Sequence, residues 1–226
     1  MEVAESRLPV MTAAALFRFF HAGDDETLAL RGVSLELMPG ELVAVMGPSG
    51  SGKSTLLACL AGLDDPDGGV VRVLGKRLSR QPEADRAALR AKRIGVLRQS
   101  GNLIEHLSVI ENIEIARTLA GGVGRSAAEL LTAVGLPDKA SAHPSRLSGG
   151  ESARAGLAVA LAGDPTVILA DEPTGEVDAD NEAMIIDLLL AEVARGTAVL
   201  VMTHSDRVAK AARRVLHLTD GVLTDV

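Results

Sequence analysis

The segment that most restricts the fold of this chain is Gly47-Pro-Ser-Gly-Ser-Gly-Lys-Ser54, which lies between the apolar run 41–46 and the helical pattern 54–63. A loop of the form G-x-x-x-x-G-K-[ST], preceded by a strand and followed by a helix, binds phosphates through its backbone N–H groups. Its glycines let the backbone curl, and the helix N-terminus adds positive potential. An ordinary Gly/Ser turn is the alternative, but the flanking pattern favours a nucleoside triphosphate site.

The rest of the chain alternates between short β-branched runs and longer mixed apolar segments. We expect strands at 33–37, 41–46, 70–74, 166–170 and 198–203. We expect helices at 54–63, 153–163 and 181–194. Buried strands followed by helices predict an α/β fold with a mainly parallel sheet and helices on its faces. Asp220-Gly221, between two short apolar runs, predicts a hairpin at the end of the chain.

Residues 102–147 differ from this pattern, since they contain no convincing strand. Ser108 with Glu111, and Ser126 with Glu129, have the spacing of capping boxes that each open a helix. Glycines within 121–124 separate the two helices. We therefore expect a helical insert here.

Composition limits the class of protein. The 226 residues carry a formal net charge of −7, which argues against nucleic acid as a partner. The basic stretch 86–93 is better explained as the solvated face of a helix. No apolar run approaches the roughly 20 residues that span a bilayer. Residues 9–17 resemble the core of a signal peptide, but the acidic leader and Arg18 favour a first strand. We expect a soluble, intracellular protein.

Three phenylalanines, Phe17, Phe19 and Phe20, are the only aromatic residues among Phe, Trp and Tyr. Side chains alternate between the faces of a strand, so Phe17 and Phe19 share one face and are expected in the core. Phe20 points the other way, just before a turn. It is either a third core ring or a ring exposed for another purpose.

Polar residues follow several of the predicted strands. Lys53 would bridge the β- and γ-phosphates and Ser54 would hold Mg²⁺, while Asp171 at the end of a strand would support the metal. Glu172 follows directly and could polarise a water molecule. His204 and Gln99 also follow strand-like runs, at the edge of an open α/β sheet where ligands bind.

Ser148-Gly-Gly-Glu151 opens another helical pattern. Serine and glutamate at this spacing form a capping box, which would explain both residues structurally. Two glycines weaken a helix start, however, and make sense if something approaches the backbone closely. The alternative is therefore a second anion site at a helix N-terminus.

The motifs, and the order in which they occur along the chain, resemble those of the nucleotide-binding subunits of ABC transporters. The resemblance covers essentially the whole chain and rests on GPSGSGKST, Gln99, LSGGE (147–151), ADEPTGEVD (170–178) and THS (203–205). ALRGVSLEL and LADEPTGEVD look most like the subgroup that serves lipoprotein release and macrolide or peptide export.

The resemblance implies a single ABC ATPase domain over 1–226. It has a P-loop NTPase core, an antiparallel N-terminal β-subdomain and a helical subdomain at 102–150. It also implies an ATP-dependent homodimer in which the signature of one subunit completes the ATP site of the other.

Catalysis would then involve Glu172 as general base, His204 at the γ-phosphate and Lys53. Phe20 would stack on adenine, and Asp178 would lie in a loop crossing the dimer interface. ATP-binding residues would be Phe20, Gly47, Pro48, Ser49, Gly50, Ser51, Gly52, Lys53, Ser54 and Thr55. Signature residues would be Ser148, Gly149, Gly150 and Glu151, and Mg²⁺ contacts would be Ser54, Gln99 and Asp171.

Two positions depart from the family pattern and bear on coupling to a membrane partner. Arg98 stands where an aromatic residue is usual, and Val159 where an arginine is usual. The implied function is an ATP-hydrolysing subunit, bound to the inner face of the membrane through separately encoded permease subunits. It would drive export or pull on a membrane protein that regulates cell-wall enzymes. The alternative is a soluble ABC-type ATPase that binds DNA or ribosomes and acts on them as a nucleotide-dependent switch.

Overall fold

The computed structural model describes residues 8–22 and 25–225. Within these residues the larger of two sheets has six strands. They are β3 (Leu42–Met46), β6 (Ile94–Leu97), β7 (Val167–Asp171), β8 (Ala198–Met202), β9 (Arg214–Thr219) and β10 (Val222–Asp225). The strand order is β10-β9-β3-β8-β7-β6. Parallel pairing joins β9, β3, β8, β7 and β6, and only β10 pairs antiparallel, through the predicted hairpin at Asp220-Gly221.

The central strands are buried on both faces, which explains why they are almost continuously apolar. Successive residues contribute to opposite sides of the sheet. Val167 and Leu169 belong to one hydrophobic cluster, whereas Ile168 and Ala170 belong to the other. The sheet therefore separates two cores, and its carboxyl ends are left free to carry functional side chains.

The second sheet is antiparallel and packs on one of these cores. Its strands are β1 (Met11–Ala22), β2 (Asp25–Leu37), β4 (Gly68–Val73) and β5 (Lys76–Arg77), in the order β2-β1-β4-β5. Residues 33–37, expected as a separate strand, are the end of the long strand β2. The first strand expected near the N-terminus is β1.

The prediction that Phe17 and Phe19 are core residues is wrong. Phe17 is 38% exposed, and Phe19 is only partly buried. The β1–β2 pairing changes register between Leu16 and Phe17 and again between Arg18 and Phe19, so simple alternation does not hold. The Phe17 ring lies over Gly32 of β2 and Gly68 of β4, where its atoms are 3.2 and 3.1 Å from the positions that Cβ atoms would take. It covers two strand glycines from the outside rather than filling the core.

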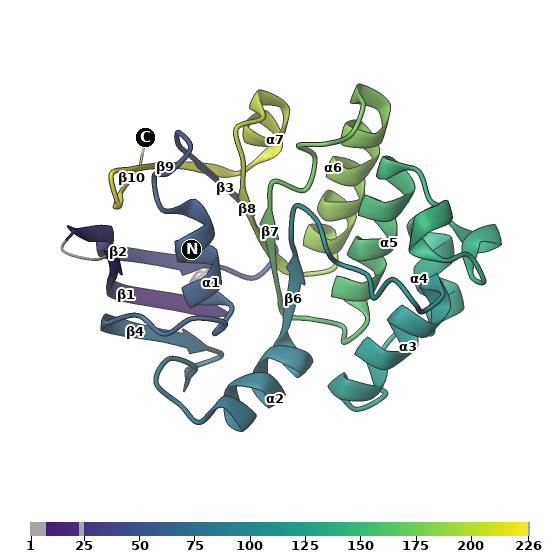
Figure 1. The fold of residues 1–226 in the computed structure, drawn as a ribbon, viewed down its shortest axis with the longest axis horizontal. Coiled ribbons are helices and arrows are strands. Elements are labelled where there is room, and N and C mark those ends of the chain that lie inside the picture. The colour runs from purple at the N-terminus through teal and green to yellow at the C-terminus, as the bar shows by residue number, and fades with distance from the viewer. Residues whose placement is uncertain (1–7, 23–24, 226) are drawn as a thin grey trace, which may run out of the picture.

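Helices cover both faces of the larger sheet (Figure 1). They are α1 (Lys53–Leu60), α2 (Glu83–Arg93), α3 (Val109–Ala120), α4 (Ala127–Ala133), α5 (Gly149–Leu161), α6 (Ala179–Ala194) and α7 (Asp206–Ala211). Short 3₁₀ helices occupy Pro137–Lys139 and Pro144–Arg146. In Figure 1, α1 lies between the two sheets, whereas α3, α4, α5 and α6 lie on the other side of the larger sheet.

Between residues 102 and 147 the chain is helical and contains no strand, as expected. Both predicted capping boxes form, at the starts of α3 and α4. Gly121, Gly122 and Gly124 between them have positive φ, which glycine adopts without strain. Cys59 is fully buried, and burial raises the pKa of its thiol to about 12. Among residues 8–22 and 25–225, no helix is both long and apolar enough to span a membrane.

Candidate active site

The phosphate loop connects β3 to α1 in the predicted strand–loop–helix arrangement. Gly52, just before the helix, has φ of 104°, and no side chain caps the helix start. The first N–H groups of α1 are therefore available to an anion. Lys53 is the first residue of α1, and its Nζ donates to the carbonyls of Gly47 at 2.7 Å and Pro48 at 3.0 Å. Its positive charge is held directly over the loop.

Close backbone contacts explain two of the loop glycines. A Cβ at Gly47 would lie 2.1 Å from the carbonyl oxygen of Leu218 in β9, and one at Gly52 would lie 2.5 Å from that of Ala29 in β2. Both distances are far inside van der Waals contact. The loop can therefore adopt this shape only with glycine at these positions, quite apart from any ligand.

A cleft of about 760 Å³ gathers most of the predicted site residues. Besides the loop and Thr55, it is lined by Phe20, Gln99, Asp171, Glu172 and His204. Phe20 comes from antiparallel β1, whereas the other four follow or end parallel strands, at the sheet edge where α/β proteins bind ligands. Two further lining residues, Thr27 and Ala29 of β2, were missed in the sequence because only the pairing of β2 with β1 brings them there.

Ser51 is the one residue of the predicted loop that does not line this cleft. It is 4% exposed, and its Oγ has no hydrogen-bond partner among the described residues. Its backbone N–H donates to Pro48 and its carbonyl accepts from Gly221. Ser51 thus holds the loop in shape through its backbone hydrogen bonds.

Glu172 and His204 form a hydrogen-bonded pair in the cleft. Oε2 of Glu172 lies 2.9 Å from His204 Nδ1 and also accepts from the backbone N–H of His204 at 3.3 Å. The Glu172 side chain is 15% exposed, while that of His204 is 73% exposed. Glu172 has φ of 46°, an uncommon conformation for a residue other than glycine, and its N–H donates to the Met202 carbonyl of β8. The backbone is thus bent so that Glu172 turns into the cleft.

Gln99 follows β6 and meets the segment beyond Glu172. Its amide nitrogen donates to Oε1 of Glu176 at 3.0 Å. The described residues contain no group of three or more His, Cys, Asp or Glu side chains placed to hold a metal ion. The hydroxyl of Ser54, the carboxylate of Asp171 and the amide of Gln99 share the cleft, and these are oxygen donors of the kind that Mg²⁺ prefers.

The segment Ser148–Glu151 lies outside this cleft, at the start of α5. Ser148 and Glu151 form a complete capping box, so the structural explanation of both residues is confirmed. Lys139 also contacts Glu151 at 2.8 Å. The hydrogen bond from Lys139, together with the one from the Ser148 backbone, lowers the pKa of Glu151 to about 2.

The two glycines of this segment have different environments. A Cβ at Gly150 would lie 2.3 Å from Asn181 of α6, so packing within the chain requires glycine there. At Gly149 the nearest atom to such a Cβ is the carbonyl oxygen of Glu176, 3.6 Å away. Packing within the chain thus explains Gly150 and leaves Gly149 unexplained.

Asp178 caps the N-terminus of α6. Its carboxylate accepts from the backbone and side-chain amides of Asn181, and the backbone hydrogen bond is the main cause that lowers its pKa. Asn181 also accepts from the buried guanidinium of Arg154 in α5. The Asp178 segment is therefore tied to the helix that begins at Gly149.

A second hollow, of about 570 Å³, lies where α2, β6, α3 and α5 meet. Arg98 and Val159, the two positions that depart from the family pattern, both line it. Small and aliphatic side chains form much of its surface, among them Ala87, Ala91, Val96, Leu119 and Ala160.

Comparison with known proteins defines the family. The ABC transporter family model matches residues 30–175, and the chain belongs to this family. It is thus an ATP-binding ATPase cassette of the ABC transporter class.

Two similar proteins come from lipoprotein-release and macrolide-export systems. The lipoprotein-releasing system ATP-binding protein LolD of Novosphingobium aromaticivorans is 40% identical over 220 residues, which are 95% of this chain and 98% of that protein. The macrolide export ATP-binding/permease protein MacB of Chlorobium luteolum is 38% identical over 95% of this chain but only 33% of its own length. This chain therefore spans about one third of such combined ATP-binding/permease proteins.

Solved structures agree with the fold. A dimeric ATP-binding cassette in a post-hydrolysis state, bound to ADP and Pi, has a TM-score of 0.88 at 32% identity and covers 95% of this chain and 98% of that one. A dimeric bacterial ABC transporter cassette matches with the same score and coverage. These matches confirm the fold class, including the antiparallel N-terminal sheet.

Proposed function

We propose that this chain binds ATP with Mg²⁺ in the 760 Å³ cleft and hydrolyses it within a head-to-tail pair of subunits that drives an exporter-type membrane permease. The single observation that carries the proposal is the composition of the cleft. It combines the phosphate loop, a strand-end carboxylate, a Glu–His pair and an exposed aromatic ring.

The cleft residues divide the work of hydrolysis. The phosphates accept hydrogen bonds from the N–H groups of the loop and of the start of α1. Lys53 exchanges its two carbonyl partners for the β- and γ-phosphates. Glu172 accepts a proton from the attacking water, and His204 contacts the γ-phosphate while holding the Glu172 carboxylate in place. Phe20, 42% exposed at the cleft, offers a ring face to adenine.

Ser54, Asp171 and Gln99 fit a magnesium site formed together with phosphate oxygens. When bound, Mg²⁺ neutralises charge on the β- and γ-phosphates. The amide nitrogen of Gln99 donates to Glu176, so the amide oxygen is the Gln99 atom that would bind the cation.

The signature segment supports a shared site between two subunits. It does not line its own cleft, yet it presents a helix start with an unobstructed glycine at Gly149. In the proposed dimer, Ser148 and Gly149 meet the γ-phosphate bound by the partner copy, an isologous arrangement. Asp178 would lie at the same interface, in the segment that caps α6.

Coupling to the membrane would use the helical part of a single 1–226 ATPase domain. We propose residues 102–150 as its helical subdomain, with the 570 Å³ hollow as the permease docking surface. Through a separately encoded permease, the chain would lie peripherally on the cytoplasmic face of the membrane. Force transmission without solute transport fits the same site. A switch on DNA or ribosomes is not favoured, because the relatives named above serve lipoprotein release and macrolide export.

Glu172→Gln tests the site and the dimer together. The substitution keeps side-chain size but removes the base, so hydrolysis should fall by about 10²-fold or more while ATP binding survives. ATP then persists between the subunits, and size-exclusion chromatography with light scattering should show a dimer with ATP and a monomer without it.

Adding Ser148→Arg should abolish that dimer, because a long side chain occupies the place of the γ-phosphate. A Glu172→Gln protein that binds ATP but stays monomeric would contradict the shared site. A dimer that survives Ser148→Arg would leave Ser148 as a capping residue only.

A further inference from the structure

The Phe20 ring lines the cleft and also contacts a cationic side chain, that of Arg18. The guanidinium carbon of Arg18 lies 4.8 Å from the ring centroid. Phe20 lines the cleft, whereas Arg18 is not among the residues that line it. This contact places the two side chains together on β1, across the register change between Arg18 and Phe19. The ring is thus supported by Arg18 and turned to the cleft with its remaining surface.

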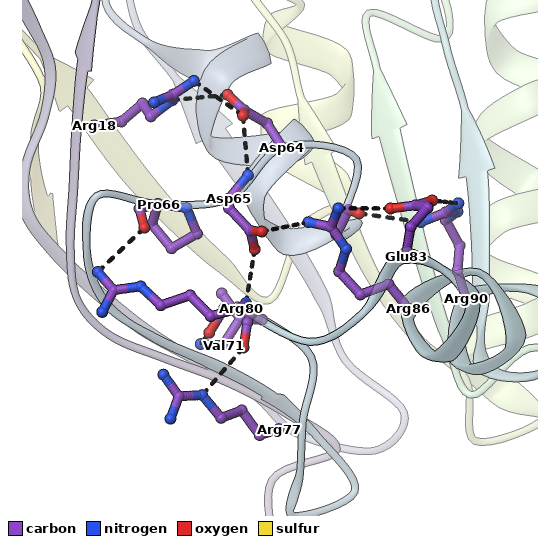
Figure 2. A network of polar contacts seen from close by, with 12 residues as sticks. Arg18, Asp64, Asp65, Pro66, Val71, Arg77, Arg80, Glu83, Arg86 and Arg90 are labelled. Carbon is purple, nitrogen blue, oxygen red and sulfur yellow. Dashed lines mark hydrogen bonds and ion pairs between the residues drawn. The ribbon is translucent and has the colours of Figure 1, made fainter.

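Arg18 itself is fixed by two carboxylates. Its Nε and one terminal nitrogen bind the two oxygens of Asp64 at 2.8 and 3.0 Å, and its other terminal nitrogen contacts Asp67 at 3.1 Å. Figure 2 shows the paired contacts between Arg18 and Asp64. A bidentate guanidinium–carboxylate contact defines orientation as well as distance, so the plane above the ring is held in place.

The carboxylates belong to the loop that follows α1, the helix whose start forms the phosphate site. The backbone N–H groups of Leu63 and Asp64 donate to Ala58 within α1. Asp67 accepts from the N–H of Phe19 at 2.8 Å and donates its own N–H to the Phe17 carbonyl at 2.9 Å. The loop therefore joins the ring-bearing end of β1 to the phosphate-binding helix.

This loop is braced from its other side. Asp64 also accepts from the N–H of Asp65, and the Asp65 carboxylate accepts from the N–H of Arg80 and pairs with Arg86 of α2 at 2.7 Å (Figure 2). Several charge-assisted contacts thus hold the loop rigid at the point where it clamps Arg18.

We propose that Arg18 is a positioning residue of the ATP site, which holds the Phe20 ring in the orientation that stacks on the base. This inference rests on the proposed function, in which Phe20 contacts adenine. A half-exposed ring at a strand end is otherwise free to change rotamer, and ordering it on binding would weaken affinity. The Arg18 guanidinium contacts the ring and so fixes the orientation of the Phe20 side chain before ATP binds.

The chain offers a direct probe, because it contains no Trp and no Tyr. Phe20→Trp introduces a single indole whose fluorescence reports the ring alone. Combined with Arg18→Gln, the indole should show lower anisotropy and stronger acrylamide quenching than with Arg18 present. Addition of ATP should restore much of the difference, since the base then orders the ring.

Affinity measurements test the same point in the parent protein. Isothermal titration with ATP and with inorganic tripolyphosphate separates the contribution of the nucleoside from that of the phosphates. Arg18→Gln should reduce the preference for ATP over tripolyphosphate by about two- to fivefold, the range for an exposed cation–aromatic contact. Tripolyphosphate affinity should stay unchanged, and in a Phe20→Ala background Arg18→Gln should have no effect on the preference.

Arg117→Gln is the matched control, since it removes an arginine that pairs with Glu114 of α3, outside the network that holds Arg18 and outside the cleft. It should leave both indole mobility and the ATP preference as in the parent. If Arg18→Gln does not fold, as judged by urea unfolding, Asp64→Asn loosens the same guanidinium and should lower the preference in the same direction.

Two outcomes would overturn the inference in distinguishable ways. If Phe20→Ala lowers ATP affinity but Arg18→Gln changes neither the preference nor the indole, or weakens ATP and tripolyphosphate equally, Arg18 does not position the ring. If Phe20→Ala leaves ATP affinity unchanged, the stacking role of Phe20 in the proposed function fails, and the role of Arg18 fails with it.

Discussion

Nδ1 of His204 lies 2.9 Å from Oε2 of Glu172, and the same oxygen accepts a hydrogen bond from the His204 backbone N–H at 3.3 Å. A carboxylate oxygen has no hydrogen to donate, so this short distance favours the imidazole tautomer with its hydrogen on Nδ1. The other ring nitrogen is then free to face the phosphates. One residue holds the proposed base in position with one atom and can contact the ligand with the other.

Substitution of His204 can separate these two roles. His204→Ala loses both atoms and should lower the hydrolysis rate by about 10- to 100-fold, the scale of one charge-assisted hydrogen bond. His204→Asn can keep a donor near the place of Nδ1 but has nothing at Nε2, so it should also be impaired. Phosphate release under saturating ATP measures both. An Asn variant at the parent rate would show that His204 only orients Glu172.

Lys53→Ala should abolish measurable hydrolysis and weaken ATP binding by about tenfold or more, because the β- and γ-phosphates lose a charged partner. Calorimetry and phosphate release give the two quantities. Lys53→Arg is the control, since it keeps the charge but not the compact ammonium. Hydrolysis by the alanine variant at the parent rate would contradict the phosphate-loop assignment.

The two signature glycines should respond differently to alanine. Gly150→Ala drives a methyl group into Asn181 and should lower the free energy of unfolding by about 1–3 kcal/mol, as overpacking does. Gly149→Ala meets nothing closer than 3.6 Å, and alanine favours helix more than glycine does. Its stability should therefore be at least that of the parent in urea unfolding.

In the Glu172→Gln background, however, Gly149→Ala should lose the ATP-induced dimer, because in the proposed dimer the added methyl group would face the partner's phosphate. Light scattering in ATP checks this expectation. Normal dimerisation of the Gly149→Ala protein would mean that no ligand approaches the signature backbone.

Glu151 should make stability depend on pH. Its pKa is lowered from 4.5 to about 2 in the folded protein, so the folded state favours the ionised form. The resulting stabilisation is complete above the unfolded pKa and disappears as the pH falls through 4.5 toward 2. Glu151→Gln should be less stable than the parent at pH 7, and the difference should shrink as the pH falls through this window. Urea unfolding at a series of pH values measures it, and a difference independent of pH would contradict the assignment.

The sequence alone determined the class of the site, because its elements are local. The phosphate loop, the capping boxes and the carboxylates after an apolar run depend on residues within a few positions of one another. Parallel strands place their carboxyl ends at one edge. For this reason the pattern of strands and polar residues is enough to predict that Asp171, Glu172, His204 and Gln99 lie near Lys53.

What only the tertiary structure decided depends on contacts between distant segments. The register shifts in β1 expose Phe17, and strand alternation cannot reveal them. Gly150 is required by Asn181 of a different helix, so a pattern that suggested a ligand for both glycines supports one only for Gly149. The contact of Arg18 with Phe20 follows from Asp64, 46 residues away in the chain. Sequence spacing encodes backbone geometry, whereas side-chain partners across the core are set only when the sheets and helices pack.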